Sequence, residues 1–297
     1  MVPVLYALIC LIWGSTWLAI KVGLAGMPPF LGAGVRFVVS TVIAGGMLVL
    51  RRKPIALSRD DKVCVLSLGL LVFWLDYAAV YWAEVHISSG LTAVLFSTMP
   101  LMTALMSAFW TRSEPLNARK LLGIVVGVVG TALLFWPQEQ MSAMHALGML
   151  SALAGSALAA VNLVTMKKYG GQSDPFVLNF LGMGIGAACL LAMSAALEPW
   201  SAVVWTRENI LAIAYLSVLG SIVAFSAYYY LIKRLDATAV SLTTLIIPIV
   251  ALVLGRWFLQ ETVTSTAVGG IFTILAGVAI AILPPAALRS SPVIPDV

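Results

Sequence analysis

The sequence predicts an all-α integral membrane protein with ten transmembrane helices, arranged as two inverted-topology repeats of five helices. Three observations lead to this fold class. First, 61% of the 297 residues are hydrophobic and only 10% are charged, whereas about a quarter are charged in a soluble globular domain. Second, the apolar residues form runs long enough to cross a bilayer. Third, short motifs recur in the two halves of the chain.

Each predicted span is a run of about 20 mostly apolar residues, which is the length that crosses the hydrocarbon core of a bilayer. Charges, Pro/Gly clusters or polar turns separate the runs. The spans cover residues 4–21, 31–50, 63–83, 88–110, 118–136, 146–166, 175–196, 209–231, 237–257 and 264–283. The connections are short, so they leave no room for a soluble catalytic domain.

The basic residues are concentrated in one set of alternating connections. Thirteen of the 17 Lys and Arg residues fall in this set, whereas the opposite set holds Arg207 and the helix-end residues Lys21 and Arg256. The positive-inside rule then predicts that both termini are cytoplasmic. The net charge of +5 thus reflects topology, and we expect a lipid bilayer but no nucleic acid among the partners.

An internal repeat follows from the number of spans. Five spans per half make corresponding helices face opposite ways, as in an inverted repeat, and we divide the chain into residues 1–138 and residues 139–297, the second including a short C-terminal tail. Matching motifs support the division: Gly14-Ser15 with Gly155-Ser156, Pro29-Phe30 with Pro175-Phe176, Tyr81 and Pro100 with Tyr229 and Pro248, and Glu114 with Glu261. Glycines follow both glutamates at nine and sixteen residues.

Four features together resemble one known family. They are Trp13-Gly14-Ser15 with Lys21, Arg36-Phe37, a mid-helix proline in the fourth and ninth spans, and the repeated Glu-then-Gly pattern. The chain resembles the EamA-type branch of the drug/metabolite transporter superfamily over nearly its whole length, and within it the amino-acid exporters. The resemblance implies a bacterial inner-membrane location, cytoplasmic termini and export of small metabolites from a central cavity. In the second half, Gly182 stands where a counterpart of Arg36 would fall. Any role of Arg36 is therefore expected in the first half alone.

In the first predicted span four side chains share one face, because they recur at intervals of three or four residues. These residues are Tyr6, Cys10, Trp13 and Trp17. Helix packing and cavity lining both account for such a face. We select Trp17 as a candidate substrate-binding residue, because the resemblance places this helix beside the cavity.

Asp76 lies well inside the third span, where an ionised carboxylate costs at least about 2.5 kcal/mol. Tyr77 and Tyr81 lie beside it on the same helix, and all three are candidate substrate-binding residues. Two interpretations of Asp76 remain open. It is either neutralised by Arg36 or a neighbouring helix, or it receives the ammonium group of a substrate or a proton. Glu84 and His86 are interpreted as residues of the outer mouth.

A polar strip in the sixth span includes Asn162, whose amide could bind a substrate carboxylate or amine. Small polar residues also mediate ordinary helix packing in membranes. Pro100 and Pro248 each remove a backbone hydrogen bond in mid-span, and we interpret them as hinges. Met99 and Thr244 beside them, and Tyr228 on the aromatic eighth span, complete the candidate substrate-binding set.

These features predict an exporter of amino acids, aromatic ones among them, and of related small metabolites. We expect it to work by alternating access as a monomer without cofactor or metal. One alternative is a proton-coupled antiporter of cationic drugs with Asp76 as the shared site. A third hypothesis is an intramembrane enzyme. It would need a cluster of catalytic side chains within the bilayer, and the sequence offers only Asp76, Glu84 and His86 on one helix. The sequence contains no GxxxxGK[ST] motif for binding nucleotide phosphates, and we expect no enzymatic activity.

Overall fold

The computed structural model describes residues 2–52, 55–111, 117–134, 142–170, 174–232, 243–262 and 264–282. These residues form helices and contain no strand, so the all-α class is confirmed. The α-helices are α1 (Val2–Gly23), α2 (Pro29–Leu50), α3 (Arg59–Leu66), α4 (Tyr77–His86), α5 (Ser89–Phe96), α6 (Met99–Met106), α7 (Ala118–Leu134), α8 (Ala143–Tyr169), α9 (Pro175–Leu197), α10 (Arg207–Tyr215), α11 (Ala224–Ile232), α13 (Thr243–Phe258) and α14 (Ser265–Ile282).

Several predicted spans are built from more than one helical segment. A π-helical segment, Ser67–Asp76, joins α3 to α4, and another, Leu216–Val223, joins α10 to α11. Seven helices among the described residues are long and apolar enough to cross a membrane, while α7, α13 and α14 are shorter. The exact count of ten crossings therefore stays a prediction.

Local sequence explains where many helices begin. Ser58 and Asp61 form a capping box at the start of α3, and Ser142 caps α8. Pro29 and Pro175 occupy the first turn of α2 and α9, where proline loses no intrahelical hydrogen bond. The outward faces carry large apolar side chains such as Val49 and Phe272, as expected for a surface in contact with lipid.

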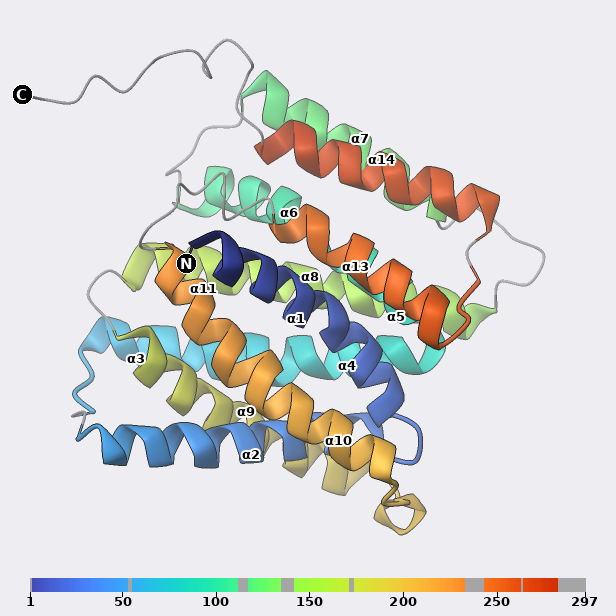
Figure 1. The fold of residues 1–297 in the computed structure, drawn as a ribbon. Helices are drawn as coiled ribbons and strands as arrows, with labels where there is room; N and C mark the ends of the chain where they lie inside the picture. Colours follow the sequence, from blue (N-terminus) through green and yellow to red (C-terminus); the bar gives the residue numbers. More distant parts are fainter. Residues whose placement is uncertain are drawn as a thin grey trace, which may run out of the picture.

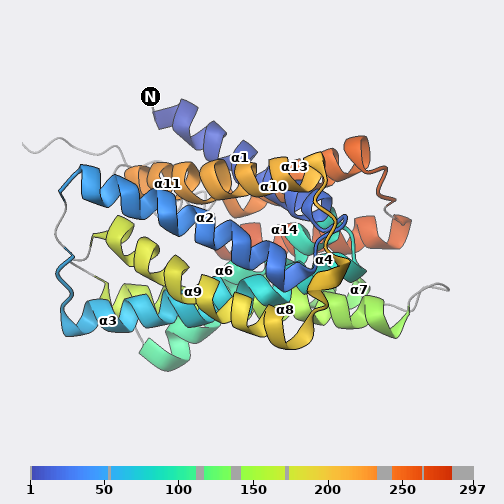
Figure 2. The same cartoon turned by 90° about the horizontal axis from the view of Figure 1, so that it is seen from below.

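The helix contacts follow a two-fold pattern. α1 packs against α10, α11 and α13, whereas α8, its counterpart in the second half, packs against α4, α5 and α6. α2 pairs with α9 at one edge of the molecule, and α7 pairs with α14 at the opposite edge (Figure 1). Viewed from below, α1, α11 and α13 lie on one side and α3 and α8 on the other (Figure 2). This is the contact pattern that two related halves produce.

Glycines bring α7 and α14 into close contact. A Cβ atom placed on Gly277 would lie 2.5 Å from the backbone nitrogen of Gly127, and one on Gly123 would lie 2.6 Å from the carbonyl oxygen of Gly277. Only glycine permits this backbone approach. The glycine faces of the fifth and tenth spans thus join the two halves of the chain.

Charged side chains bind helix termini at one end of the bundle, which we call the capped end. The Glu198 carboxylate accepts hydrogen bonds from the backbone N–H groups of Phe30 (2.7 Å) and Leu31 (2.9 Å) at the start of α2. The Lys21 ammonium donates to the carbonyl oxygen of Ile87, just after α4 (2.9 Å). Both contacts compensate the partial charge of a helix terminus.

The opposite end, which we call the basic end, carries Arg51 and Arg52 after α2 and Lys167 and Lys168 in the last turn of α8. The Arg51 guanidinium lies 5.9 Å from the ring centroid of Phe176 at the start of α9. Basic residues thus lie at the end of the molecule that the charge count assigns to the cytoplasm.

Candidate functional site

Aromatic rings form a continuous column through the interior, which we call the aromatic column. Its members are Tyr228, Trp13, Phe225, Phe73, Phe37, Tyr77 and Tyr81. The ring centroids of Phe37 and Tyr77 lie 4.6 Å apart, those of Phe37 and Phe73 5.0 Å apart, and those of Phe73 and Phe225 6.1 Å apart. The column therefore connects α1, α2, the third predicted span and α11.

Helical spacing explains how one span supplies three of these rings. Phe73, Tyr77 and Tyr81 follow one another at intervals of four residues, so they lie along one helix face. Phe37 comes from α2 and lies edge-on to both Phe73 and Tyr77. The contacts between the two helices thus fix the position of the rings.

Arg36 lies beside the middle of the column. Its side chain is 1% exposed, and the guanidinium carbon lies 4.8 Å from the Tyr77 ring centroid and 5.1 Å from that of Phe37. The Nε atom donates to the Ser221 hydroxyl (3.3 Å), and Nη2 lies 3.5 Å from the Tyr77 hydroxyl. Nη1 is buried and has no hydrogen-bond partner in the described part of the chain. The cation therefore retains a free donor in the interior.

No carboxylate in the described ranges pairs with Arg36. Its electrostatic partners there are the hydroxyl groups of Tyr77 and Tyr81. An arginine at the centre of a membrane-spanning helix costs at least about 2.5 kcal/mol on insertion scales, and such residues normally face a partner or a water-filled cavity. Arg36 is thus a buried positive charge that its neighbours compensate only in part.

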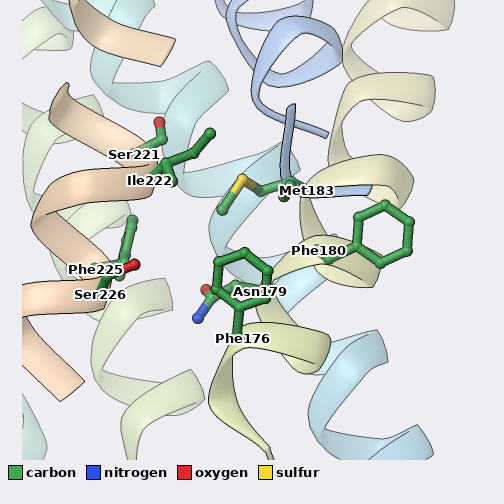
Figure 3. Close-up of a pocket in the computed structure, with 9 residues that line it drawn as sticks. Phe176, Asn179, Phe180, Met183, Ser221, Ile222, Phe225 and Ser226 are labelled. Carbon is green, nitrogen blue, oxygen red and sulfur yellow. The ribbon is translucent and has the colours of Figure 1, made fainter. Parts of the chain in front are cut away.

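Ser221 connects Arg36 to a small pocket. The pocket lies between α9 and the segment that leads into α11, and its wall is mostly apolar (Figure 3). Its free volume is about 10 Å³, which is roughly one water molecule. Residues on its wall are Ala44, Phe176, Asn179, Phe180, Met183, Ser221, Ile222, Phe225 and Ser226. This pocket is therefore nearly closed in this conformation.

The comparisons with known proteins agree with this architecture. The model of the EamA-like transporter family matches residues 1–136 and 146–283. The chain therefore belongs to the EamA-like transporter family. It is a multi-pass membrane transporter, because the matched regions cover nearly the whole chain and the fold is a bundle of apolar helices.

Relatives of this chain match it over most of their length. YoaV of Bacillus subtilis, an uncharacterised transporter, is 27% identical over 272 residues, covering 91% of this chain and 92% of the relative. YedA of Escherichia coli K12, an uncharacterised inner membrane transporter, is 29% identical over 277 residues, covering 89% and 86%. A protein of known crystal structure shares the fold with a TM-score of 0.66 at 20% identity, covering 95% of this chain and 97% of that one.

Four of the candidate residues lie at or near the aromatic column of this family member. Tyr77 and Tyr81 belong to it, with ring centroids 6.4 Å apart. Trp17 is 8% exposed in the same buried cluster, and its ring centroid lies 5.4 Å from that of Phe96. Tyr228 belongs to the column at its other end, 5.1 Å from Trp13 between ring centroids.

Two other candidates, Asp76 and Asn162, lie at the contact between α8 and the third predicted span instead of in the column. A Cβ atom on Gly155 of α8 would lie 2.7 Å from Oδ1 of Asp76, so this carboxyl group packs against the α8 backbone. Asp76 is 3% exposed, Oδ1 has no hydrogen-bond partner, and no ion pair joins Asp76 to Arg36 within the described residues. Asn162 accepts a hydrogen bond from the Ser67 hydroxyl (2.9 Å). Both contacts agree with the interpretation that the polar strip of the sixth predicted span serves helix packing.

The remaining candidates lie around the two prolines. Pro100 is in the first turn of α6, after a break at Ser97 and Thr98, whose hydroxyls donate to the carbonyl oxygens of Val94 and Leu95. Met99 is partly buried at the same break. Pro248 is buried inside α13, whereas the side chain of Thr244 lies outside the described residues. The hinge role of both prolines stays a prediction.

Several residues of this site were not among the sequence candidates. They are Arg36, Phe37, Phe73, Ser221 and Phe225. A charge inside a predicted span is a signal that could have selected Arg36. No sequence signal pairs Arg36 with Ser221, because 185 residues separate them. Among the described residues no three His, Cys, Asp or Glu side chains lie close enough together to bind a metal.

Proposed function

We propose that the protein exports amino acids and related small carboxylate-bearing metabolites across the bacterial inner membrane by alternating access. The observation that carries this proposal is the burial of Arg36 without a carboxylate partner among the residues that the structure describes. A substrate carboxylate would supply the missing negative charge, and arginine binds carboxylates through two parallel hydrogen bonds. The substrate anion thus completes a site that is charged when empty.

The surroundings of Arg36 supply the rest of the proposed site. Tyr77 and Ser221 already contact the guanidinium and can donate hydrogen bonds to a carboxylate at the same place. Phe37 and Phe73 offer apolar and aromatic surface for the substrate side chain. Mostly apolar walls with a few placed polar groups are typical of small-molecule sites. This composition favours amino acids with apolar or aromatic side chains.

The alternative is a proton-coupled antiporter of cationic drugs that uses Asp76. Arg36 argues against it, because a buried guanidinium repels a cation that enters the aromatic column. The Asp76 carboxyl group packs against Gly155 of α8, away from the Arg36 contacts. Under this alternative Asp76→Asn would abolish transport driven by a pH gradient, while under our proposal amino-acid exchange at equal pH continues in the variant.

The proposal is tested by transport into proteoliposomes with matched pairs of substrates. Each labelled amino acid is compared with its amine, which lacks only the carboxylate. We expect the purified protein to transport amino acids and not the amines. Arg36→Gln should lower amino-acid transport about 10- to 100-fold, since a hydrogen bond to a charged group contributes about 1.5–3 kcal/mol.

Arg256→Gln is the control, because Arg256 is exposed in the last turn of α13 and its loss removes the same charge. It should transport like the unmodified protein. Transport of the amines as fast as the amino acids, or full activity of Arg36→Gln, would contradict the assignment of Arg36. If no amino acid enters above the level of empty liposomes, the proposed function is wrong.

A further inference from the structure

A buried acidic side chain, Glu84, lies at the capped end, separate from the Arg36 site. Glu84 is in the last turn of α4, its residue is 0% exposed, and neither carboxyl oxygen has a hydrogen-bond partner in the described structure. The proposed export site does not use this group, but its surroundings indicate a role for it.

The charged groups around Glu84 come from two other segments. Lys21 of α1 donates hydrogen bonds to the backbone carbonyl oxygens of Glu84 and Ile87, so its ammonium group binds the end of α4. Glu261, which follows α13, approaches from the other half of the chain. Tyr81 lies one turn earlier on α4. Within the described ranges α2, α5 and α8 contribute no further charged group to these electrostatic contacts.

Glu261 and Glu84 differ in how their oxygens are satisfied. The Glu261 carboxylate accepts hydrogen bonds from the backbone N–H and hydroxyl of Ser89 (both 2.8 Å) and from the N–H of Gly90 (3.2 Å) at the start of α5. These donors stabilise a negative charge. Glu84 receives none, and an ionised carboxylate without hydrogen bonds or water is strongly disfavoured. The closed capped end therefore accommodates Glu84 as the neutral acid.

Opening of the capped end would change this balance. The contacts of Glu261 with α5 and of Glu198 with α2 both join one half of the chain to the other, so outward opening in alternating access has to break such contacts. Water then reaches Glu84, its O–H bond can break, and the proton passes to that water. The carboxylate so formed can pair with the Lys21 ammonium, which competes with the bonds that Lys21 makes to the end of α4.

We propose that Glu84 is a proton-binding site that controls the capped end, with the neutral carboxyl group required for this end to close. The inference rests on the proposed export function for its transport step. A proton taken up from the outer side closes the site after substrate release, and its loss accompanies opening. External acidity should therefore accelerate the return of the empty transporter.

Two measurements on the full-length protein test the proposal. The first is infrared spectroscopy of the purified protein, which detects the C=O stretching band of protonated carboxyl groups. We expect a band that disappears in Glu84→Gln and remains in Asp76→Asn, which separates the two buried acids. The absence of a band assignable to Glu84 would overturn the proposal. This measurement needs no substrate, so it decides on Glu84 even if no amino acid is transported.

The second measurement is the pH dependence of amino-acid export in proteoliposomes, with pH varied on the side of the capped end. Export by the unmodified protein should change by up to about tenfold per pH unit near the titration of the controlling group. Glu84→Gln should keep exchange at equal pH, which shows that it is folded, but lose this dependence. Glu208→Gln, at an exposed position near the same end, should retain it. A Glu84→Gln variant with an unchanged pH profile would refute the proposal.

Discussion

At the scale of single residues, the informative positions are charges whose partners lie far away in the sequence. Within the described residues Arg36 has no carboxylate partner and the carboxyl oxygens of Glu84 have no hydrogen-bond partner, whereas Glu198 and Glu261 bind helix termini in the other half. Charges are costly in a membrane, so each needs compensation or a use. The two glutamates with backbone partners are structural, whereas the two incompletely compensated charges are candidates for function.

Glu198→Ala tests the structural role of one such cap. The substitution leaves the N–H groups of Phe30 and Leu31 without their acceptor, so we expect the free energy of unfolding to fall by about 1–2 kcal/mol. Thermal unfolding of the purified protein in detergent measures the change. Glu208→Ala is the matched control and should stay within about 0.5 kcal/mol of the unmodified protein, as surface substitutions usually do. Equal stability of the two variants would show that the cap contributes nothing.

At the scale of secondary-structure elements, the pairs α2–α9 and α7–α14 hold the edges of the bundle. Glycines allow α7 and α14 to approach closely, because backbone atoms of one helix lie where a side chain of the other helix would be. In the third predicted span a π-helical segment ends at Asp76 and directly precedes Tyr77 and Tyr81 in α4. π-Helical turns are frequent at functional sites, which agrees with the position of the aromatic column.

Gly277→Ala tests the α7–α14 contact. The added methyl group would lie 2.5 Å from the backbone nitrogen of Gly127, and overpacking of this kind costs about 1–3 kcal/mol. Gly269→Ala in the same helix is the control, because nothing lies within 4 Å of the added carbon. Alanine is the better helix former, so the control should be neutral or slightly stabilised. Thermal unfolding compares them, and an equal effect of both substitutions would argue against the close contact.

At the scale of the whole molecule, two related halves face each other across the interior, and the two ends of the bundle differ chemically. The capped end uses charges to bind helix termini, whereas the basic end carries Arg51, Arg52, Lys167 and Lys168. Such an asymmetry orients a membrane protein through the positive-inside rule. It also gives the proposed transport cycle one end whose contacts must break during outward opening.

Cysteine labelling in intact cells tests this orientation. In a variant without the three native cysteines, Glu208→Cys should react with a membrane-impermeant maleimide, while Arg52→Cys should react only after the cells are opened. Both positions are exposed, and they lie at opposite ends of the bundle. Labelling of Arg52→Cys in intact cells would show that the predicted topology is inverted. Expression of each variant is checked by immunoblot.

The sequence by itself determined the class of protein and the family. Apolar runs, capping residues and mid-span prolines act locally, so they are readable without knowledge of the fold. The resemblance that rested on Trp13, Arg36 and the repeated Glu-then-Gly pattern agrees with the family match over both halves. The selection of Tyr77, Tyr81 and Tyr228 used the same local periodicity, and these residues lie in the aromatic column.

Only the tertiary structure decided which polar side chains meet. Asp76 and Asn162 lie on helix faces that periodicity describes correctly, but packing turns both toward contacts between α8 and the third predicted span. Arg36 reaches Ser221 across 185 residues. Helical periodicity shows which side chains share one face of a helix. Which other helix packs against that face depends on the rotation and pairing of helices across the whole chain. The isolation of Arg36 and Glu84 therefore becomes visible only in the folded molecule.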